Sequence, residues 1–243
     1  MLIKNIGILA TAEGRQARRG EEQGKIRLYK NAWILLEDDE IVEIGTGKYQ
    51  YQNDFDGEVL DAEDRLVTPG LVDAHTHLVF GGWRQNELGL KMHGVSYLEI
   101  LANGGGILST VENTREASLE ELMDKAEKAL DEMLNFGTTT CEAKSGYGLN
   151  LEHELKQLKV VRELNRRHPI DLISTFLGAH AIPVDYKNER EEFIRQICED
   201  MIPIIAEEKL AQFCDVFCET GVFTVEEARR ILETGKKYGL IPK

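Results

Sequence analysis

Two histidines at the end of an apolar stretch are the strongest chemical signal in this sequence. Residues 67–77 read VTPGLVDAHTH, so a mostly apolar run ends in the pair His75 and His77. Successive side chains of a strand point to opposite faces, and we therefore expect both imidazoles on the same side. Two imidazoles at the C-terminal end of a barrel strand can share one divalent metal ion, and hydrolytic zinc sites use three protein ligands plus a water. The sequence predicts that His75 and His77 hold a metal.

Three other residues follow apolar runs in the same way. His180 comes directly after the run in FLGAHAIP, and its role is left open between metal ligand, proton carrier and substrate contact. Arg84 follows the histidine pair in GGWR, where a guanidinium could bind a carboxylate through two parallel hydrogen bonds. Tyr147 stands between two glycines in SGYGL and could reach inward. Tyr97 is a weaker candidate, because an aromatic residue on a short amphipathic helix is more often part of a core.

The remaining histidines and the cysteines receive ordinary interpretations. His153 and His168 lie on or beside a charged helical segment and are expected to be solvated. Four cysteines do not make a disulfide framework, which favours a reducing compartment, and we predict a cytoplasmic protein. Cys214 and Cys218 lack the second half of a zinc motif and are expected to be core residues of a buried strand. That fourth apolar run contains no lysine, which favours one metal ion over a lysine-bridged pair.

Short apolar runs alternate with helical patterns along most of the chain. Helices are predicted from Ser118, with Glu121 completing a capping box, and from Thr224, with Glu227 in the same position. Pro203 should kink or end the third helix. Strands that alternate with helices predict βαβ units and a parallel sheet. The expected strands are 70–74, 138–143, 171–177 and 213–219, with a fifth beginning at 240–241, and the expected helices are 118–137, 151–167, from 188 and 224–239.

These elements predict an α/β protein built as the first half of a (β/α)8 TIM-like barrel. A complete barrel needs eight units in about 250 residues, whereas 69–243 hold four. We therefore expect a chain truncated before the fifth strand, a piece of a longer protein. Residues 1–68 mix apolar and polar residues at short range and are expected to form a small β domain, with a hairpin turn at Glu37–Asp39 and an exposed loop over 11–25.

The composition excludes two classes of binding partner, nucleic acids and membranes. The chain has 243 residues, 42% of them hydrophobic, and a net charge of −14. Such an acidic protein repels phosphate backbones and anionic lipids, so we expect neither a nucleic acid nor a membrane partner. No apolar run approaches the roughly 20 residues that cross a bilayer. A small-molecule substrate is the expected partner, and a homodimer is left open.

The motifs resemble a known family. PGLVDAHTH is similar to the first-strand motif of the amidohydrolase superfamily, and the β region before it is similar to that superfamily's composite β-sandwich. Within the superfamily, the segments that resemble imidazolonepropionases are HTHLVFGGWR, SYLEILANGGGILSTV, GTTTCEAKSGYGL, FLGAHAIP and FCETGVFT.

The resemblance implies hydrolysis of the ring amide of 4-imidazolone-5-propionate to N-formimino-L-glutamate, a step of histidine degradation. It implies one catalytic metal ion, zinc or iron, held by His75 and His77. It also implies that Arg84 contacts the propionate and that Tyr147 and His180 line the substrate pocket. The family's fifth-strand histidine, its eighth-strand aspartate and its general-base glutamate are all expected beyond Lys243.

Two alternatives stay open. One is another amidohydrolase that opens a cyclic amide or deaminates a heterocycle, and the other is an inactive fragment without the remaining metal ligands. Arg84 separates the first alternative from the main prediction, because a neutral base has no carboxylate for it to bind. An anionic substrate also needs a locally positive mouth in this acidic chain, which Arg84 and Lys144 are expected to provide.

Overall fold

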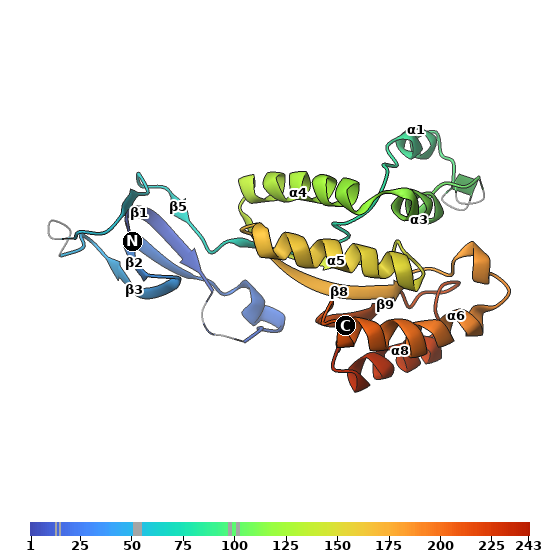
Figure 1. Cartoon of the computed structure of the whole chain (residues 1–243). Helices are drawn as coiled ribbons and strands as arrows, with labels where there is room; N and C mark the ends of the chain where they lie inside the picture. Colours follow the sequence, from blue (N-terminus) through green and yellow to red (C-terminus); the bar gives the residue numbers. More distant parts are fainter. Residues whose placement is uncertain (13, 15, 51–54, 97–98, 101–102) are drawn as a thin grey trace. The chain divides into compact units, whose positions relative to one another are not determined.

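The computed structural model describes the chain except for residues 13, 15, 51–54, 97–98 and 101–102 (Figure 1). Tyr97 therefore lies outside the described residues. The chain divides into two compact units, Met1–Gly70 and Leu71–Lys243. The candidate site residues all belong to the second unit.

The first unit is a mixed five-stranded sheet. Its central strand β1 pairs with β2, and β2 turns back into β3 through Asp38 and Asp39, where the sequence predicted a hairpin. β4 and β5 both pair with β1 in parallel. A small core of buried side chains lies on this sheet, and the segment between β1 and β2 contains one exposed turn of 3-10 helix, η1. The bounds are β1 (Leu2–Thr11), η1 (Gly20–Gly24), β2 (Arg27–Glu37), β3 (Glu40–Thr46), β4 (Val59–Asp61) and β5 (Leu66–Val67).

The second unit is built on a five-stranded parallel sheet whose strands follow one another in chain order, β6-β7-β8-β9-β10. Right-handed crossovers between neighbours in this order bring the helices to one face, as in a β/α barrel, whereas a doubly wound sheet reverses its order. The predicted α/β architecture of half a barrel is confirmed. The strands are β6 (Leu71–Thr76), β7 (Thr138–Lys144), β8 (Asp171–Ala179), β9 (Phe213–Val216) and β10 (Ile241–Pro242).

Helices cover this sheet in the order that the strands require. α4 packs on β7, α5 on β8 and α4, and α8 on β9 and β10 (Figure 1). Leu122 and Leu130 of α4 and Leu158 and Leu164 of α5 are buried between the helices and the sheet. The helices are α1 (Asn86–Met92), α3 (Ile107–Glu116), α4 (Leu119–Asn135), α5 (Leu151–Arg167), η3 (Val184–Tyr186), α6 (Arg190–Gln196), η4 (Ile197–Met201), α7 (Ile202–Glu207) and α8 (Val225–Lys237).

Two details differ from the sequence predictions and one agrees with them. α1 and α3 precede Ser118, where no helix bounds were predicted from the sequence. The third predicted helix is broken near Pro203, as expected: α6 ends at Gln196, a π-helical segment, η4, follows, and Pro203 sits in the first turn of α7, where its missing N–H costs no helical hydrogen bond. The fourth strand ends at Val216, so Cys214 is buried as expected but Cys218 is exposed on the loop that follows.

His168 also differs from its prediction. Its side chain is only 5% exposed, because it closes the C-terminal end of α5 and its Nδ1 accepts the backbone N–H of Ile170. This contact fixes the turn that leads into β8.

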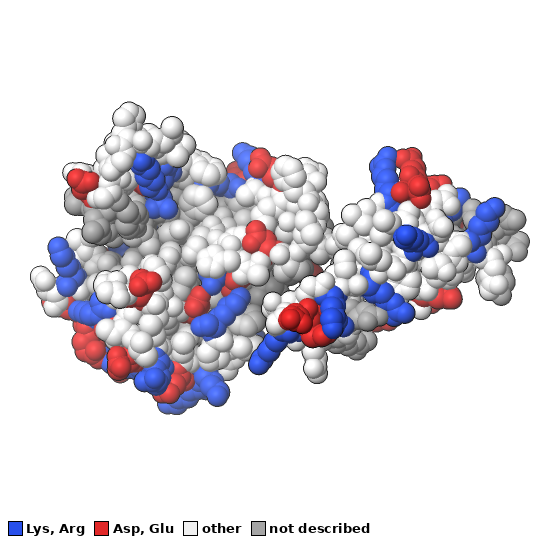
Figure 2. All heavy atoms as spheres, turned by 180° about the vertical axis from the view of Figure 1, so that it is seen from behind, with Lys and Arg blue, Asp and Glu red and all other residues white. Residues whose placement is uncertain are grey.

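The surface carries mixed charge. Figure 2 shows basic and acidic side chains interspersed over the face that it presents. In the described part of the chain, no helix combines the length and the apolar character that crossing a membrane requires.

Candidate active site

Side chains from the ends of three neighbouring strands form one aromatic cluster. His77 follows β6, Tyr147 lies in the loop after β7, and His180 follows β8. The imidazole rings of His77 and His180 stack, with centroids 4.5 Å apart and planes at 10°. The Tyr147 ring lies 4.7 Å from the first and 5.3 Å from the second. The structure thus brings together three predicted site residues, because carboxyl ends of neighbouring parallel strands share one edge of the sheet.

His75 and His77 differ in their surroundings although they are two residues apart. Their ring centroids are 6.2 Å apart; His75 is exposed, whereas His77 is half-buried. Burial lowers the pKa of His77 to about 3, and the neighbouring His180, His75 and Lys144 add to this effect. His77 is therefore neutral at pH 7, the form in which an imidazole binds a metal.

One atom of His77 fits a metal ion directly. Its Nδ1 is buried and has no hydrogen-bond partner among the described residues, and a buried polar atom without a partner is rare. Those residues contain no group of three or more histidines, cysteines and carboxylates able to hold a metal ion. His77 therefore fits a metal ion as one ligand, and the described residues around it supply fewer ligands than a hydrolytic centre uses.

His180 has a defined orientation. Its Nδ1 lies 3.0 Å from the carbonyl oxygen of Gly146, and since a carbonyl can only accept, the ring proton is assigned to Nδ1. Burial lowers the pKa of His180, while this hydrogen bond and the carboxylate of Asp215 oppose the shift. The ring is thus held in one tautomer, with Nε2 left as its acceptor.

Arg84 lies in the loop between β6 and α1, and among the described residues its half-buried guanidinium makes no hydrogen bond or ion pair. The structure does not place it against the aromatic cluster. Its neighbour Trp83 packs edge-on against Phe80, and the ammonium of Lys125 from α4 lies 3.9 Å and 3.3 Å from the centres of these two rings. Burial lowers the pKa of Lys125 to about 8. This packing fixes the loop that carries Arg84.

A cavity of about 470 Å³ opens beside the cluster. It is mostly apolar, and its volume lies in the range of small-molecule pockets. Its walls come from the N-terminus of α3 and the loops after β8 and β9, with lining residues Ile107, Leu108, His180, Ala181, Ile182, Phe217, Glu219, Thr220, Gly221 and Val222. His180 therefore faces both the aromatic cluster and this cavity.

Charged side chains of β7 and β9 form ion pairs next to the aromatic cluster. Lys144 is 5% exposed, and its Nζ lies 2.5 Å from Asp215 Oδ2 and 3.7 Å from Glu142 Oε2. Glu142 accepts hydrogen bonds from Thr175 and Lys243. The expectation that Lys144 makes the mouth positive is wrong, because two carboxylates neutralise its charge. The available signal was the pair Glu142 and Lys144, two residues apart on one face of an otherwise uncharged strand.

Known proteins similar to this chain agree with one another. It is 52% identical over 244 residues to the imidazolonepropionase of Alkaliphilus metalliredigens, covering 99% of this chain and 58% of that protein. It is 50% identical to that of Alkaliphilus oremlandii and 47% identical to that of Clostridium tetani, covering 98% and 99% of this chain and 57% and 58% of those proteins. This chain belongs to the imidazolonepropionase family. It spans somewhat more than half the length of these relatives, and no family model matches it.

Solved structures agree on the fold. A 5-methylcytosine deaminase from Klebsiella pneumoniae superposes with a TM-score of 0.62 at 16% identity, covering 100% of this chain and 50% of that one. The guanine deaminase of E. coli gives 0.55 at 15% identity, covering 98% and 60%. At such low identity these structures speak for the fold alone, and the match agrees with the half barrel described above.

Proposed function

We propose that the protein containing this chain hydrolyses the ring amide of 4-imidazolone-5-propionate to N-formimino-L-glutamate. The observation that carries the proposal is the identity of about half of all residues with imidazolonepropionases over nearly the whole chain. The aromatic cluster of His77, His180 and Tyr147 beside an apolar cavity supports it.

We further propose that His75 and His77 contribute two ligands to one zinc or iron ion, since imidazole suits both metals. The chemistry that such an ion supplies when bound is activation of a water molecule and polarisation of a carbonyl group. The neutral state of His77 and its buried, unpartnered Nδ1 support this assignment.

The chain's own residues then have distinct tasks. Arg84 binds the propionate through paired, charge-assisted hydrogen bonds and so orients the ring amide. His180, through Nε2, and Tyr147, through its hydroxyl, hydrogen-bond the imidazolone ring or the oxyanion that develops during attack. The apolar wall of the cavity excludes water around the ring.

Two further parts of the proposal concern the protein's surroundings. We propose that its partner is this small molecule, with no nucleic acid or membrane involved, and that it works in the cytoplasm. The net charge of −14 supports the absence of a nucleic-acid partner, because an acidic protein repels a phosphate backbone.

The experiment compares wild type with Arg84→Ala while following the loss of imidazolone absorbance. Removing the partner of a carboxylate costs roughly 1.5–3 kcal/mol, so kcat/KM should fall about 10- to 100-fold. Arg166→Ala, which removes an exposed arginine of α5, is the matched control. An unchanged kcat/KM in Arg84→Ala would remove Arg84 from the propionate site, and turnover of neutral heterocycles by the wild type in place of the imidazolone would favour the deaminase alternative.

The metal is tested separately by element analysis of the purified protein. His77→Ala should lose most of the bound metal, whereas His93→Ala, which removes an exposed histidine of another loop, should not. Equal metal content in both variants would remove His77 from the ligand set.

A further inference from the structure

A buried carboxylate holds the loop that carries Tyr147. Glu154, in the first turns of α5, is fully buried. Its Oε1 accepts the backbone N–H groups of Gly148 and Leu149, both at 2.8 Å, and its Oε2 accepts that of Gly146 at 3.1 Å. One side chain thus satisfies three amides of a loop that has no secondary structure of its own.

A second buried side chain on the same face of α5 extends this contact. Gln157 is also fully buried, and its Oε1 accepts the N–H of Tyr147 at 3.1 Å. Its Nε2 donates to the carbonyl oxygen of Val79 at 2.6 Å, in the loop after His77. A single helix face therefore fixes the loops that follow both β6 and β7.

The carbonyl side of the loop is fixed as well. Arg115 of α3 donates to the carbonyl oxygens of Gly148 and Leu149, at 2.7 Å and 3.3 Å. The carbonyl of Gly146 receives the Nδ1 proton of His180. Gly146 thus donates its N–H to Glu154 and, through its carbonyl oxygen, sets the tautomer of His180.

The loop has no room to shift. Gly146 has a φ of +109°, and a Cβ there would lie 2.7 Å from the Leu177 carbonyl oxygen and 2.9 Å from the Cβ of His180. A Cβ on Gly148 would lie 2.4 Å from the backbone nitrogen of Glu154. The two glycines around Tyr147 allow this close approach to α5 on one side and to His180 on the other.

We propose that Glu154 and Gln157 are positioning residues, which through loop 146–149 hold the Tyr147 ring and the imidazole of His180 in register with His77. Burying a carboxylate is costly without hydrogen bonds, and burial raises the pKa of Glu154. Glu152, two residues earlier, would keep its negative charge near the same helix end at no such cost, since it is exposed. Compared with Glu152, the buried position of Glu154 has the additional effect that it fixes loop 146–149.

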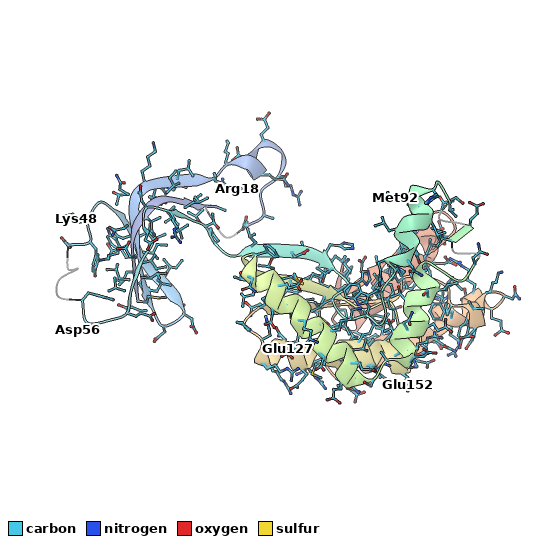
Figure 3. The ribbon with its side chains drawn as sticks, turned by 90° about the horizontal axis from the view of Figure 1, so that it is seen from above. Arg18, Lys48, Asp56, Met92, Glu127 and Glu152 are labelled. Carbon is cyan, nitrogen blue, oxygen red and sulfur yellow. The ribbon has the colours of Figure 1, made fainter. Side chains whose placement is uncertain are left out.

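The test compares Glu154→Gln with Glu152→Gln, which changes the same charge on the same turn of α5 and is labelled in Figure 3. In the wild type, amide hydrogen exchange at residues 146, 148 and 149 should be slow, although these amides lie in a loop. Glu154→Gln keeps one acceptor oxygen but turns an NH2 donor toward the remaining N–H, so at least one of the three amides should lose this protection, and nitrogen NMR of His180 should show a second tautomer. The part of the inference that concerns turnover rests on the proposed function: kcat/KM for the imidazolone should fall about 10- to 100-fold at unchanged metal content.

These readouts separate the two proposals. A wild type that shows the exchange pattern and single tautomer but no turnover contradicts the proposed function and supports the positioning role. Rapid exchange of the three amides in the wild type overturns the positioning role, and so does a Glu154→Gln protein whose tautomer and kcat/KM equal those of Glu152→Gln. If Glu154→Gln does not fold, the second variant is Gln157→Glu, which keeps an acceptor for the Tyr147 N–H and removes the donor to Val79. A kcat/KM of Gln157→Glu equal to that of Glu152→Gln then counts against the proposal. A lower kcat/KM supports it.

Discussion

Replacing Lys144 by methionine should destabilise the second unit strongly, because it unbalances a buried group of charges. The ammonium of Lys144 lies 2.5 Å from Asp215 and 3.7 Å from Glu142, and Glu142 is 2.7 Å from the ammonium of Lys243. Two positive and two negative groups therefore cancel. Methionine keeps most of the length of lysine but leaves one negative charge uncompensated.

The magnitude follows from burial. Removing one partner of a buried ion pair costs about 3–5 kcal/mol. Lys144 is 5% exposed, but Asp215 is 20% exposed, so water partly solvates the carboxylate that remains. We expect a loss near the lower limit, about 3 kcal/mol of the free energy of unfolding. Lys144→Met combined with Asp215→Asn should recover most of it, because no charge is then left without a partner.

The assay is urea unfolding followed by the helical circular dichroism signal, since every α-helix of the described residues lies in the second unit. Lys159→Met is the matched control: Lys159 pairs with Glu208 at 3.3 Å, and both side chains are more than one-third exposed. Such surface pairs contribute about 0–1 kcal/mol. Equal losses in Lys144→Met and Lys159→Met, or a double variant no more stable than Lys144→Met, would refute the reasoning.

Two further predictions concern pH. The pKa of Lys125 is lowered from 10.5 to about 8, so the folded state releases this proton at a lower pH than the unfolded state does. The free energy of unfolding should therefore rise as pH increases from about 8 to 10.5, and the fluorescence of Trp83 should titrate near pH 8. Lys125→Met should abolish both effects. The hydrogen bonds from Arg190 lower the pKa of Glu227 from 4.5 to about 2, so its stabilisation is complete above pH 4.5 and is lost as pH falls toward 2; Glu227→Gln should remove this dependence in urea unfolding at a series of pH values.

Neighbouring exposed residues supply the controls for these two predictions. Lys128→Met, on the same helix as Lys125, should leave the fluorescence titration near pH 8 intact. Glu226→Gln, beside Glu227 in the first turn of α8, should keep the loss of stability in acid. A fluorescence titration that survives Lys125→Met would assign it to another group, and an acid response equal in Glu226→Gln and Glu227→Gln would contradict the role of Arg190.

Local features of the fold were predictable because their signals are local in sequence. The capping boxes at Ser118 and Thr224 predicted the starts of α4 and α8, and both are formed by side chains three residues apart. The two short helices α1 and α3 were not predicted. α3 begins after Gly106 without a side-chain cap, and α1 has seven residues, so neither offers a strong starting signal or a long period.

The site was predictable where it depends on strand ends. His77, Tyr147 and His180 each follow an apolar run, and a parallel sheet brings such positions to one edge. The helix face that fixes them was not predicted, although Glu154 precedes the buried Leu158 by four residues and so lies on the buried side of α5. An acidic residue in the first turn of a helix is ordinarily exposed and is stabilised there by the helix dipole. Glu152 and Glu154 both fit this interpretation equally well.

By itself the sequence determined the order of the strands and of the longer helices, two of the helix caps, and the family to which the chain is related, since periodicity and short motifs act over a few residues. Only the tertiary structure decided which charges neutralise one another and which carboxylate binds which loop. Asp215, which lies nearest the Lys144 ammonium, is on another strand, and the amides that Glu154 accepts are in the loop before its helix, at spacings in the chain that follow no period. Their selection depends on desolvation: once a charge is enclosed, the only groups able to stabilise it are those that the packed sheet and helices bring within hydrogen-bond distance.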